Sequence, residues 1–231
     1  MFNGKKKAIT FSYDDGVVQD IRLIELLNKY GLKCTFNINS ELLGVGRVLV
    51  QKNGKIAHYK IMKDQVREIY EGHELAVHTL THPALIKCSD EEIVRQVEED
   101  RKNIEELVGY DVVGMAYPGG SPCVDERVEN ILRDHTKIKY ARGTRCSHSF
   151  DIPTNLYHFE PTVFHLGFDK MMELGREFVE MAPDEPKLFY IWGHSYEMNY
   201  DSLNWYRLEE FFKLVSGRED IFYGNNTEVL L

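Results

Sequence analysis

Residues 7–16 read KAITFSYDDG, an apolar, β-prone run that ends in two adjacent acids and a glycine. The run predicts a buried strand, and Asp14 and Asp15 then lie at the mouth of that strand. Neighbouring carboxylates repel each other, and an Asp-Gly turn needs only one acid. The presence of the second acid must therefore be explained by other parts of the sequence.

Strand-like and helix-like segments alternate outward from this first strand to the end of the chain. Repeated β-then-α units imply a mostly parallel sheet with helices outside, and about seven such units favour a closed or distorted barrel. Alternating residues around Asn53-Gly54 predict a β-hairpin insertion within residues 46–60. A short strand pair is expected at the C-terminus. Helices are predicted at residues 21–31, 62–72, 89–109, 124–135, 168–182 and 203–215, and further strands at 33–39, 74–78, 112–118, 138–144, 156–165 and 187–194.

Composition limits the class of protein. The chain has 231 residues, 43% of them hydrophobic, and no Pro/Gly/Ser-rich linker, so one domain over residues 1–231 is expected. The net charge of −9 argues against nucleic acid as the main partner, because phosphate binding needs a basic stripe. No apolar run reaches the roughly 18 residues of a membrane span, and no signal peptide is recognisable. A cytoplasmic protein without a membrane partner is expected, or a secreted one if a signal was removed. The four scattered cysteines predict reduced thiols.

Unusual residues follow four of the predicted strands. In β/α barrels the chemistry gathers where strands end and loops begin, and these loops converge on one rim. Side chains that are far apart in the sequence can therefore meet there. The four segments are Asp14-Asp15-Gly16, His78-Thr-Leu-Thr-His82-Pro83, Ala116-Tyr117-Pro118-Gly119-Gly120 and Gly193-His194-Ser195.

The spacing of His78 and His82 places both rings on one side of a helix or across a tight turn, and either arrangement can chelate a metal. Two histidines and one carboxylate form an open catalytic metal site, which leaves a position for water and lowers the pKa of that water. One of the two adjacent acids can then bind the cation while the other stays free as a base. Two ordinary loop histidines and a plain Asp-Gly turn are the structural alternatives.

Two further strand ends carry candidate groups. His194 follows the apolar segment LFYIW, so it is either a partly shielded general acid beside a cleft or a satisfied core histidine. The Tyr117–Gly120 segment predicts a sharp loop whose glycines let the backbone approach a ligand and whose N–H groups could bind an oxyanion. A plain Pro-Gly turn is the alternative.

These segments resemble the motifs of polysaccharide deacetylases, carbohydrate esterase family 4, also called the nodulation-protein-B homology domain. FSYDDG, HTLTHP, AYPGG and IWGH are similar to the first, second, third and fifth family motifs, in the family's order, across residues 9–194. The resemblance implies a distorted (β/α)7, TIM-barrel-like fold and a divalent metal, most commonly zinc, with cobalt, manganese, nickel or iron as alternatives. It also implies hydrolysis of N-acetyl groups on an amino-sugar polymer or oligomer by metal-activated water.

The resemblance assigns roles residue by residue. The implied metal ligands are Asp15, His78 and His82, and Asp14 is the implied base. His194 would protonate the departing amine, and the N–H of Gly119 would help to hold the oxyanion.

The chain departs from the family pattern in the third and fourth motifs. Ala116 stands where an arginine normally orients the base, Gly119 replaces an aromatic residue, and the fourth motif has no clear match. We hypothesise that Arg142 or Arg145 supplies the missing charge near Asp14; two surface arginines are the alternative. Tyr13, Tyr117 and Trp192 are candidate aromatic residues for stacking on the substrate.

Three other functions remain open on the sequence. A cyclic imide or ureide hydrolase would keep the chemistry and change the substrate to a small amide. An iron-dependent oxygenase also uses two histidines and a carboxylate, but the β/α alternation disfavours it. A non-catalytic sugar-binding module would predict damaged metal ligands, whereas all three are present. The sequence leaves the oligomeric state open.

Overall fold

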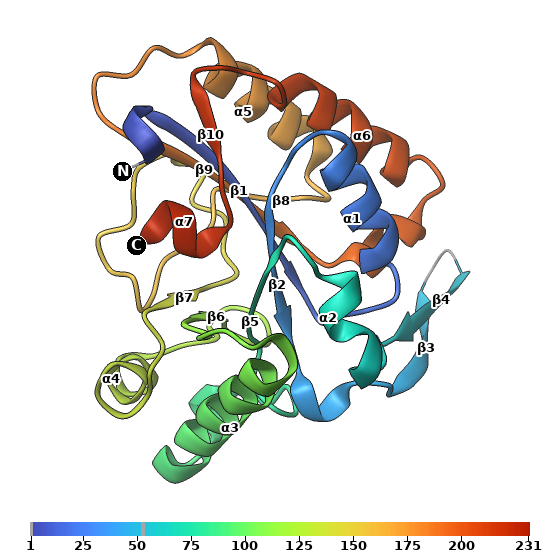
Figure 1. Ribbon diagram of the computed structural model, residues 1–231, viewed down its shortest axis with the longest axis vertical. Coiled ribbons are helices and arrows are strands. Elements are labelled where there is room, and N and C mark those ends of the chain that lie inside the picture. Colours follow the sequence, from blue (N-terminus) through green and yellow to red (C-terminus); the bar gives the residue numbers. More distant parts are fainter. Residues whose placement is uncertain (1, 52–53) are drawn as a thin grey trace.

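The computed structural model describes residues 2–51 and 54–231, and its centre is a curled parallel sheet (Figure 1). The strand order is β7-β6-β5-β2-β1-β9-β8, and β10 pairs with β1 at its N-terminal end. This half-barrel confirms the predicted distorted (β/α) barrel. The strands of the sheet are β1 (Lys7–Asp14), β2 (Cys34–Ile38), β5 (Glu74–Val77), β6 (Gly114–Ala116), β7 (Tyr140–Arg142), β8 (Val163–Phe164), β9 (Lys187–Gly193) and β10 (Ile221–Tyr223).

Strand β1 lies at the middle of the sheet, and all eight of its residues are buried. A continuous buried strand is typical of a parallel sheet covered on both faces. Its register places Asp14 beside Asn37 of β2 and Tyr13 beside Gly193 of β9. The C-terminal ends of these three strands therefore open onto the same rim, where the acids follow.

Helices cover the outside of the sheet, with α5 and α6 packed together along one side and α3 and α4 along another (Figure 1). The longest, α3, begins and ends where the sequence predicts: Ser89 Oγ accepts from Glu92 N–H, and Gly109 closes it at φ 81°. No helix in the described part of the chain is long and apolar enough to cross a membrane. The helices are α1 (Asp20–Lys29), α2 (Val66–Ile69), α3 (Asp90–Val108), α4 (Glu126–His135), α5 (Phe168–Glu180), α6 (Asn204–Val215) and α7 (Asn226–Leu230).

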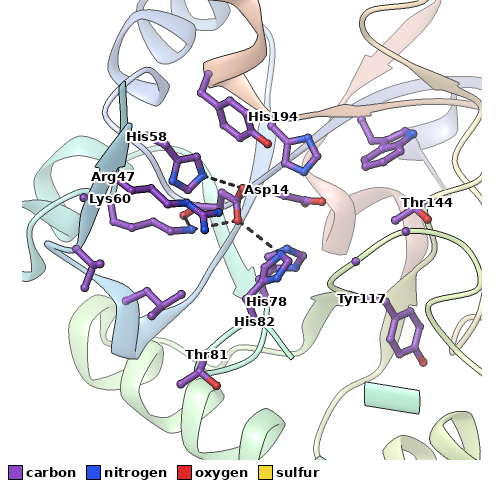
Figure 2. Close-up of a pocket in the computed structure, with 18 residues that line it drawn as sticks. Asp14, Arg47, His58, Lys60, His78, Thr81, His82, Tyr117, Thr144 and His194 are labelled. Atoms are coloured by element: carbon purple, nitrogen blue, oxygen red, sulfur yellow. Dashed lines mark hydrogen bonds and ion pairs between the residues drawn. The ribbon is translucent and has the colours of Figure 1, made fainter. Parts of the chain in front are cut away.

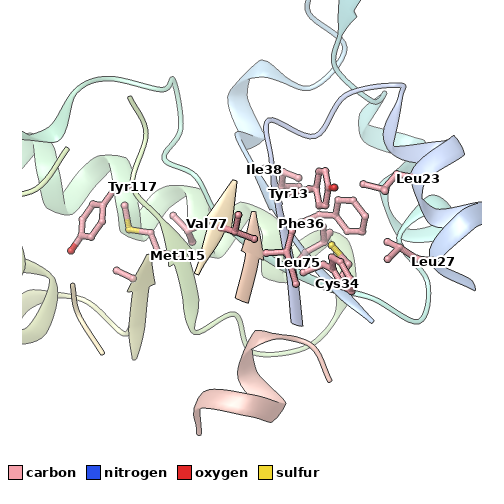
Figure 3. Close-up of a cluster of buried hydrophobic side chains, with 14 of the residues drawn as sticks. Tyr13, Leu23, Leu27, Cys34, Phe36, Ile38, Leu75, Val77, Met115 and Tyr117 are labelled. Carbon is pink, nitrogen blue, oxygen red and sulfur yellow. The ribbon is translucent and has the colours of Figure 1, made fainter. Parts of the chain in front are cut away.

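Apolar side chains from neighbouring strands and helices form the main core (Figure 3). Phe11 of β1 packs edge-on against Phe212 of α6, with ring centroids 5.2 Å apart, and Phe36 of β2 lies 4.9 Å from Tyr70. Both phenylalanines are completely buried. Truncating either to alanine is expected to cost about 3–5 kcal/mol, so this core fixes the strand ends in place.

The predicted hairpin insertion is present as β3 (Gly46–Gln51) and β4 (Gly54–Tyr59), a separate antiparallel pair; Asn53 of the predicted turn lies outside the described residues. The hairpin is attached to the loop after β1, because Val18 N–H donates to Tyr59 O at 2.9 Å and Ile61 N–H donates to Gly16 O at 2.9 Å. It therefore stands beside the rim that carries the acids.

Three predicted elements differ from the structure. The strand expected over residues 156–165 is reduced to β8, because Pro161 cannot donate to a ladder and the preceding residues form loops. The C-terminal strand pair is one strand, β10, followed by α7, which Asn225 and Glu228 start with a capping box. The helix expected over residues 62–72 is a 3-10 turn followed by the single turn of α2.

Candidate active site

A cavity of about 590 Å³ opens where the strands end, and the predicted acids and histidines line it (Figure 2). Asp14 closes β1, Asp15 follows it, and His78 follows β5, two strands away in the sheet. His194 comes from the end of β9, on the opposite side of β1. The rim of the sheet thus brings together residues from three distant parts of the sequence.

Asp15, His78 and His82 form a compact cluster in which one ligand atom from each residue lies within 4.8 Å of the others. The backbone supports this arrangement at a conformational cost, since Asp15 (φ 86°), Thr79 (φ 66°) and His82 (φ 62°) all adopt the left-handed region. Thr79 Oγ1 accepts from His82 N–H at 3.1 Å and so holds the turn between the two histidines. The three side chains are close enough together that they could hold a metal ion.

The hydrogen bonding of His78 fits a metal ligand. Its Nδ1–H donates to Ala116 O at 2.8 Å, which leaves Nε2 as the nitrogen with the lone pair. This Nε2 is buried and has no hydrogen-bond partner in the described part of the chain. Burial lowers the pKa of His78 to about 4 and also lowers the pKa of His82, so both rings are neutral at pH 7 and available as ligands.

Asp14 is held by a different set of residues. One oxygen, Oδ1, accepts hydrogen bonds from Arg142 and from Asn37 Nδ2, the latter at 2.8 Å. Arg142 makes the contact with Asp14 that the sequence predicts for one of two arginines. Arg145 does not: it is 75% exposed and lies 3.8 Å from Glu160. Arg142 reaches Asp14 from β7, across the interior of the curled sheet. It thus provides the positive charge beside Asp14 that Ala116 cannot provide.

Asp15 is bound by two basic residues of the hairpin that the sequence did not single out. His58 Nε2 lies 3.2 Å from Oδ2, and Lys60 Nζ donates to Oδ1 at 3.0 Å and to Asn39 Oδ1 at 2.9 Å. Burial raises the pKa of Asp15, but the His58 hydrogen bond and the Lys60 charge outweigh it and lower the pKa well below the usual range. The carboxylate is therefore ionised. For Lys60 the effect of burial outweighs that of its partner. Burial lowers the pKa of Lys60 more than the charge of Asp15 raises it, and the charge of Arg47 lowers it further.

His194 faces the cavity as the sequence predicts, and Glu197 lies beneath it. Glu197 Oε2 lies 3.1 Å from His194 Nδ1 and 2.7 Å from Nε2 of the buried His165. Burial lowers the pKa of His194, but the hydrogen bond and charge of Glu197, with the charges of the two acids, raise it to about 9. His194 is therefore protonated at pH 7 and can donate a proton.

The remaining predicted residues are divided between the cavity and the core. Gly119 lines the cavity at φ 89° with open space around its Cα, and Trp192 also lines it, with Arg142 Cζ 4.8 Å from its ring centroid. Tyr117 reaches the wall, but its ring is fully buried and turned away, and its hydroxyl donates to Tyr157 O (Figure 2). Tyr13 is also fully buried and does not line the cavity. These positions do not support stacking of substrate on either tyrosine.

A period-two pattern could have drawn attention to the hairpin residues. Ile56, His58 and Lys60 are the buried positions of residues 54–60; they are two residues apart and therefore lie on the same face. Basic side chains that alternate in the same register as a buried isoleucine indicate that this face of the strand packs against polar or acidic groups. Glu197 lies three residues after His194, a spacing that brings the two together in a 3-10 turn.

Comparison with known families gives the class of protein. A model of the polysaccharide deacetylase family matches residues 3–138, more than half of the chain. The chain belongs to the polysaccharide deacetylase family, as the motifs indicated. The peptidoglycan-N-acetylglucosamine deacetylase PgdA of Listeria monocytogenes is 26% identical over 117 residues, which are 50% of this chain and 22% of PgdA. The chain thus spans about a fifth of the length of the curated relatives it matches.

Solved structures agree on the fold. A carbohydrate esterase family 4 pseudoenzyme from Bacillus anthracis superposes with a TM-score of 0.59 at 18% identity, covering 98% of this chain and 66% of that one. The family 4 esterase domain of a multidomain xylanase, from the hindgut metagenome of Trinervitermes trinervoides, gives 0.58 at 17% identity, with 97% and 89% covered. Peptidoglycan deacetylase PdaC of Bacillus subtilis, solved as a mutant, gives 0.54 at 15% identity, with 97% and 90% covered.

Proposed function

We propose that this chain is a metal-dependent hydrolase that removes an N-acetyl group from an amino sugar. The observation that carries the proposal is the Asp15–His78–His82 cluster, with its buried, unpartnered His78 Nε2, directly beside an Asp14 carboxylate fixed by Arg142. Membership of the polysaccharide deacetylase family and the similarity to PgdA support the reaction type. A divalent ion held by the three ligands, zinc first among the candidates, would activate a water molecule and polarise the acyl oxygen.

The two acids have separate tasks in this proposal. Asp15 is a ligand, and its carboxylate is ionised because His58 and Lys60 stabilise the charge. Asp14 takes the proton of the attacking water. Its Oδ1 is clamped by Arg142 and Asn37, so Oδ2 is the oxygen left to accept this proton. The arginine keeps the base from rotating and balances its charge before the reaction.

The other groups act on the acyl oxygen and the leaving nitrogen. The N–H of Gly119, in an open loop at the cavity wall, is available to bind the oxygen of the tetrahedral intermediate. Protonated His194 delivers a proton to the departing amine, and Glu197 keeps the imidazole charged and oriented. Asp14 thus gains a proton from the attacking water, and His194 gives one to the nitrogen as the C–N bond breaks. The products are acetate and a free amino sugar.

The test is acetate release from N-acetylglucosamine oligomers by metal-loaded and chelator-treated protein, with Asp14→Asn as the catalytic variant. Arg176→Gln, on the outer helix α5 and outside the cavity, is the matched control. We expect activity in the loaded wild type and control, and a loss of at least about a hundredfold in the Asp14 variant. Acetate release that neither chelation nor the Asp14 substitution changes would refute the proposed mechanism.

A further inference from the structure

The charges around the cavity are out of balance. Its two acids, Asp14 and Asp15, are each already paired with a buried cation, Arg142 and Lys60 respectively. Arg47 lines the same cavity from an exposed position of the hairpin, and no carboxylate in the described part of the chain pairs with it. This surplus of positive charge occurs in a protein whose formal net charge is −9, so it is not a reflection of overall composition.

The strand register places Arg47 close to the reacting groups. Arg47 of β3 lies directly opposite His58 of β4, and cross-strand neighbours on one face have Cβ atoms about 4.5–5.5 Å apart. His58 in turn contacts Asp15 at 3.2 Å. Figure 2 shows the Arg47 side chain extending from the hairpin beside Lys60, toward the carboxylates. The arginine therefore lies one cross-strand step from a residue that touches a proposed metal ligand.

The charge count determines what kind of ligand the cavity favours. With both internal ion pairs neutral, and His194 balanced by Glu197, Arg47 remains as an uncompensated cation. A divalent ion on the proposed ligands, Asp15, His78 and His82, would add two further positive charges. A neutral amino sugar balances none of this charge, whereas a ligand with its own negative charge does.

We infer that the substrate bears an anionic group close to its acetamide, and that Arg47 binds this group. The inference rests on the proposed function and makes N-acetylated saccharides that carry a carboxylate or a phosphate the preferred members of its substrate class. A guanidinium suits this task because its planar fork of N–H donors matches both oxyanions. The hairpin, which lies outside the four recognised motifs, thereby acts as the specificity element of the site.

Three small sugars test whether the cavity prefers an anion and which one. They are N-acetylglucosamine, N-acetylmuramic acid (the 3-O-lactyl ether of N-acetylglucosamine) and N-acetylglucosamine 6-phosphate. The first is neutral, the second adds a carboxylate and the third adds a phosphate, so the two anions identify which oxyanion is preferred. Binding to metal-loaded protein is followed by the fluorescence of Trp192, which lines the cavity; Trp205, the other tryptophan, does not line it. We expect at least one anion to bind about tenfold more tightly than the neutral sugar, the scale of one charge-assisted hydrogen bond.

Arg47→Gln should abolish this preference, and Arg47→Lys should retain part of it, because the charge remains while the fork is lost. Lys55→Gln removes a positive charge from the same hairpin at an exposed position outside the cavity, and it should leave the preference intact. Circular dichroism verifies that each variant is folded. Equal binding of all three sugars by the wild type would overturn the inference, and so would a preference that survives in Arg47→Gln.

The outcomes keep this inference separate from the proposed function. Arg47-dependent binding of an anionic sugar without acetate release from any sugar would refute the deacetylase proposal and support the anion site. Acetate release from neutral oligomers, together with equal binding of the three probes, would overturn the anion site alone.

Discussion

Replacing Arg142 by methionine should destabilise the protein by about 3–5 kcal/mol, because it leaves the Asp14 carboxylate buried without its cation. The side chain of Arg142 is 0% exposed and that of Asp14 is 2% exposed, so water cannot replace the lost charge. The guanidinium also donates to Gly143 O at 3.0 Å and lies over the ring of Trp192. Methionine is shorter than arginine but keeps an unbranched, apolar stem, which limits the packing loss so that the electrostatic effect dominates.

A double-mutant cycle tests whether the cost comes from the pair. Asp14→Asn alone leaves the arginine as an unpaired buried cation and should also destabilise the protein. The double variant, Asp14→Asn with Arg142→Met, contains neither charge. It should therefore be more stable than the sum of the single effects predicts, by about 2–3 kcal/mol.

The measurement is urea unfolding in the presence of a chelator, so that bound metal does not mask the effect. The dependence of the unfolding free energy on urea concentration is compared between variants, because an unchanged slope shows that stability alone has changed. For a chain of this size the arginine variant should also melt roughly 6–20 °C lower. The matched control is Arg133→Met, since Arg133 forms a partly exposed pair with Glu129 on α4 and should cost no more than about 1 kcal/mol. Equal small losses in both arginine variants, or strict additivity in the cycle, would refute a stabilising role for the buried pair.

The other predictions concern the metal, the proton donor and the hairpin lysine. Chelation should abolish acetate release and added divalent ion should restore it, whereas His78→Ala should bind the ion too weakly in equilibrium dialysis for restoration. Burial lowers the pKa of His194, but Glu197 raises it to about 9. The protonated imidazole therefore stabilises the folded protein fully below about pH 6.5, and this stabilisation is lost as the pH rises through about 9. The stability advantage of wild type over His194→Gln should follow that course in urea unfolding, and Glu197→Gln should move the alkaline limb of kcat to lower pH. Lys60→Met should lower the melting temperature of metal-free protein and tighten metal binding about tenfold or more in calorimetry, because a cation beside Asp15 is removed.

The sequence was sufficient to predict the barrel and the position of the site. Strand β1 is apolar throughout and is followed at once by the acids, and parallel sheets place such strand ends on one rim. This rule brings His78 and His194 to Asp15 without any contact having to be predicted. The same rule made Arg142 a candidate partner for Asp14, because it ends the strand that follows the modified third motif.

Side-chain direction was the part that the sequence could not supply. Tyr13 and Tyr117 adjoin motif residues, yet both are fully buried. Tyr13 precedes Asp14 in β1, and successive residues of a strand face opposite sides of the sheet. Trp192 faces the cavity from the neighbouring strand. For Lys60 and His58 the alternating pattern marks a buried face but does not identify what that face contacts. Their contact with Asp15 depends on how the hairpin folds back onto the loop after β1, which no local pattern encodes.

Each of the two adjacent acids at the end of the first strand has a cation of the protein itself beside it, in addition to any metal ion that Asp15 binds. Arg142 reaches Asp14 from across the sheet, and Lys60 of the hairpin segment reaches Asp15. The left-handed backbone at Asp15, φ 86°, turns the second carboxylate out of line with the strand, so the two acids reach different partners. Because both charges are already balanced, any divalent ion adds net positive charge to the site. An anionic ligand in the cavity would compensate that charge, which links the pairing of the two acids to the identity of the ligand.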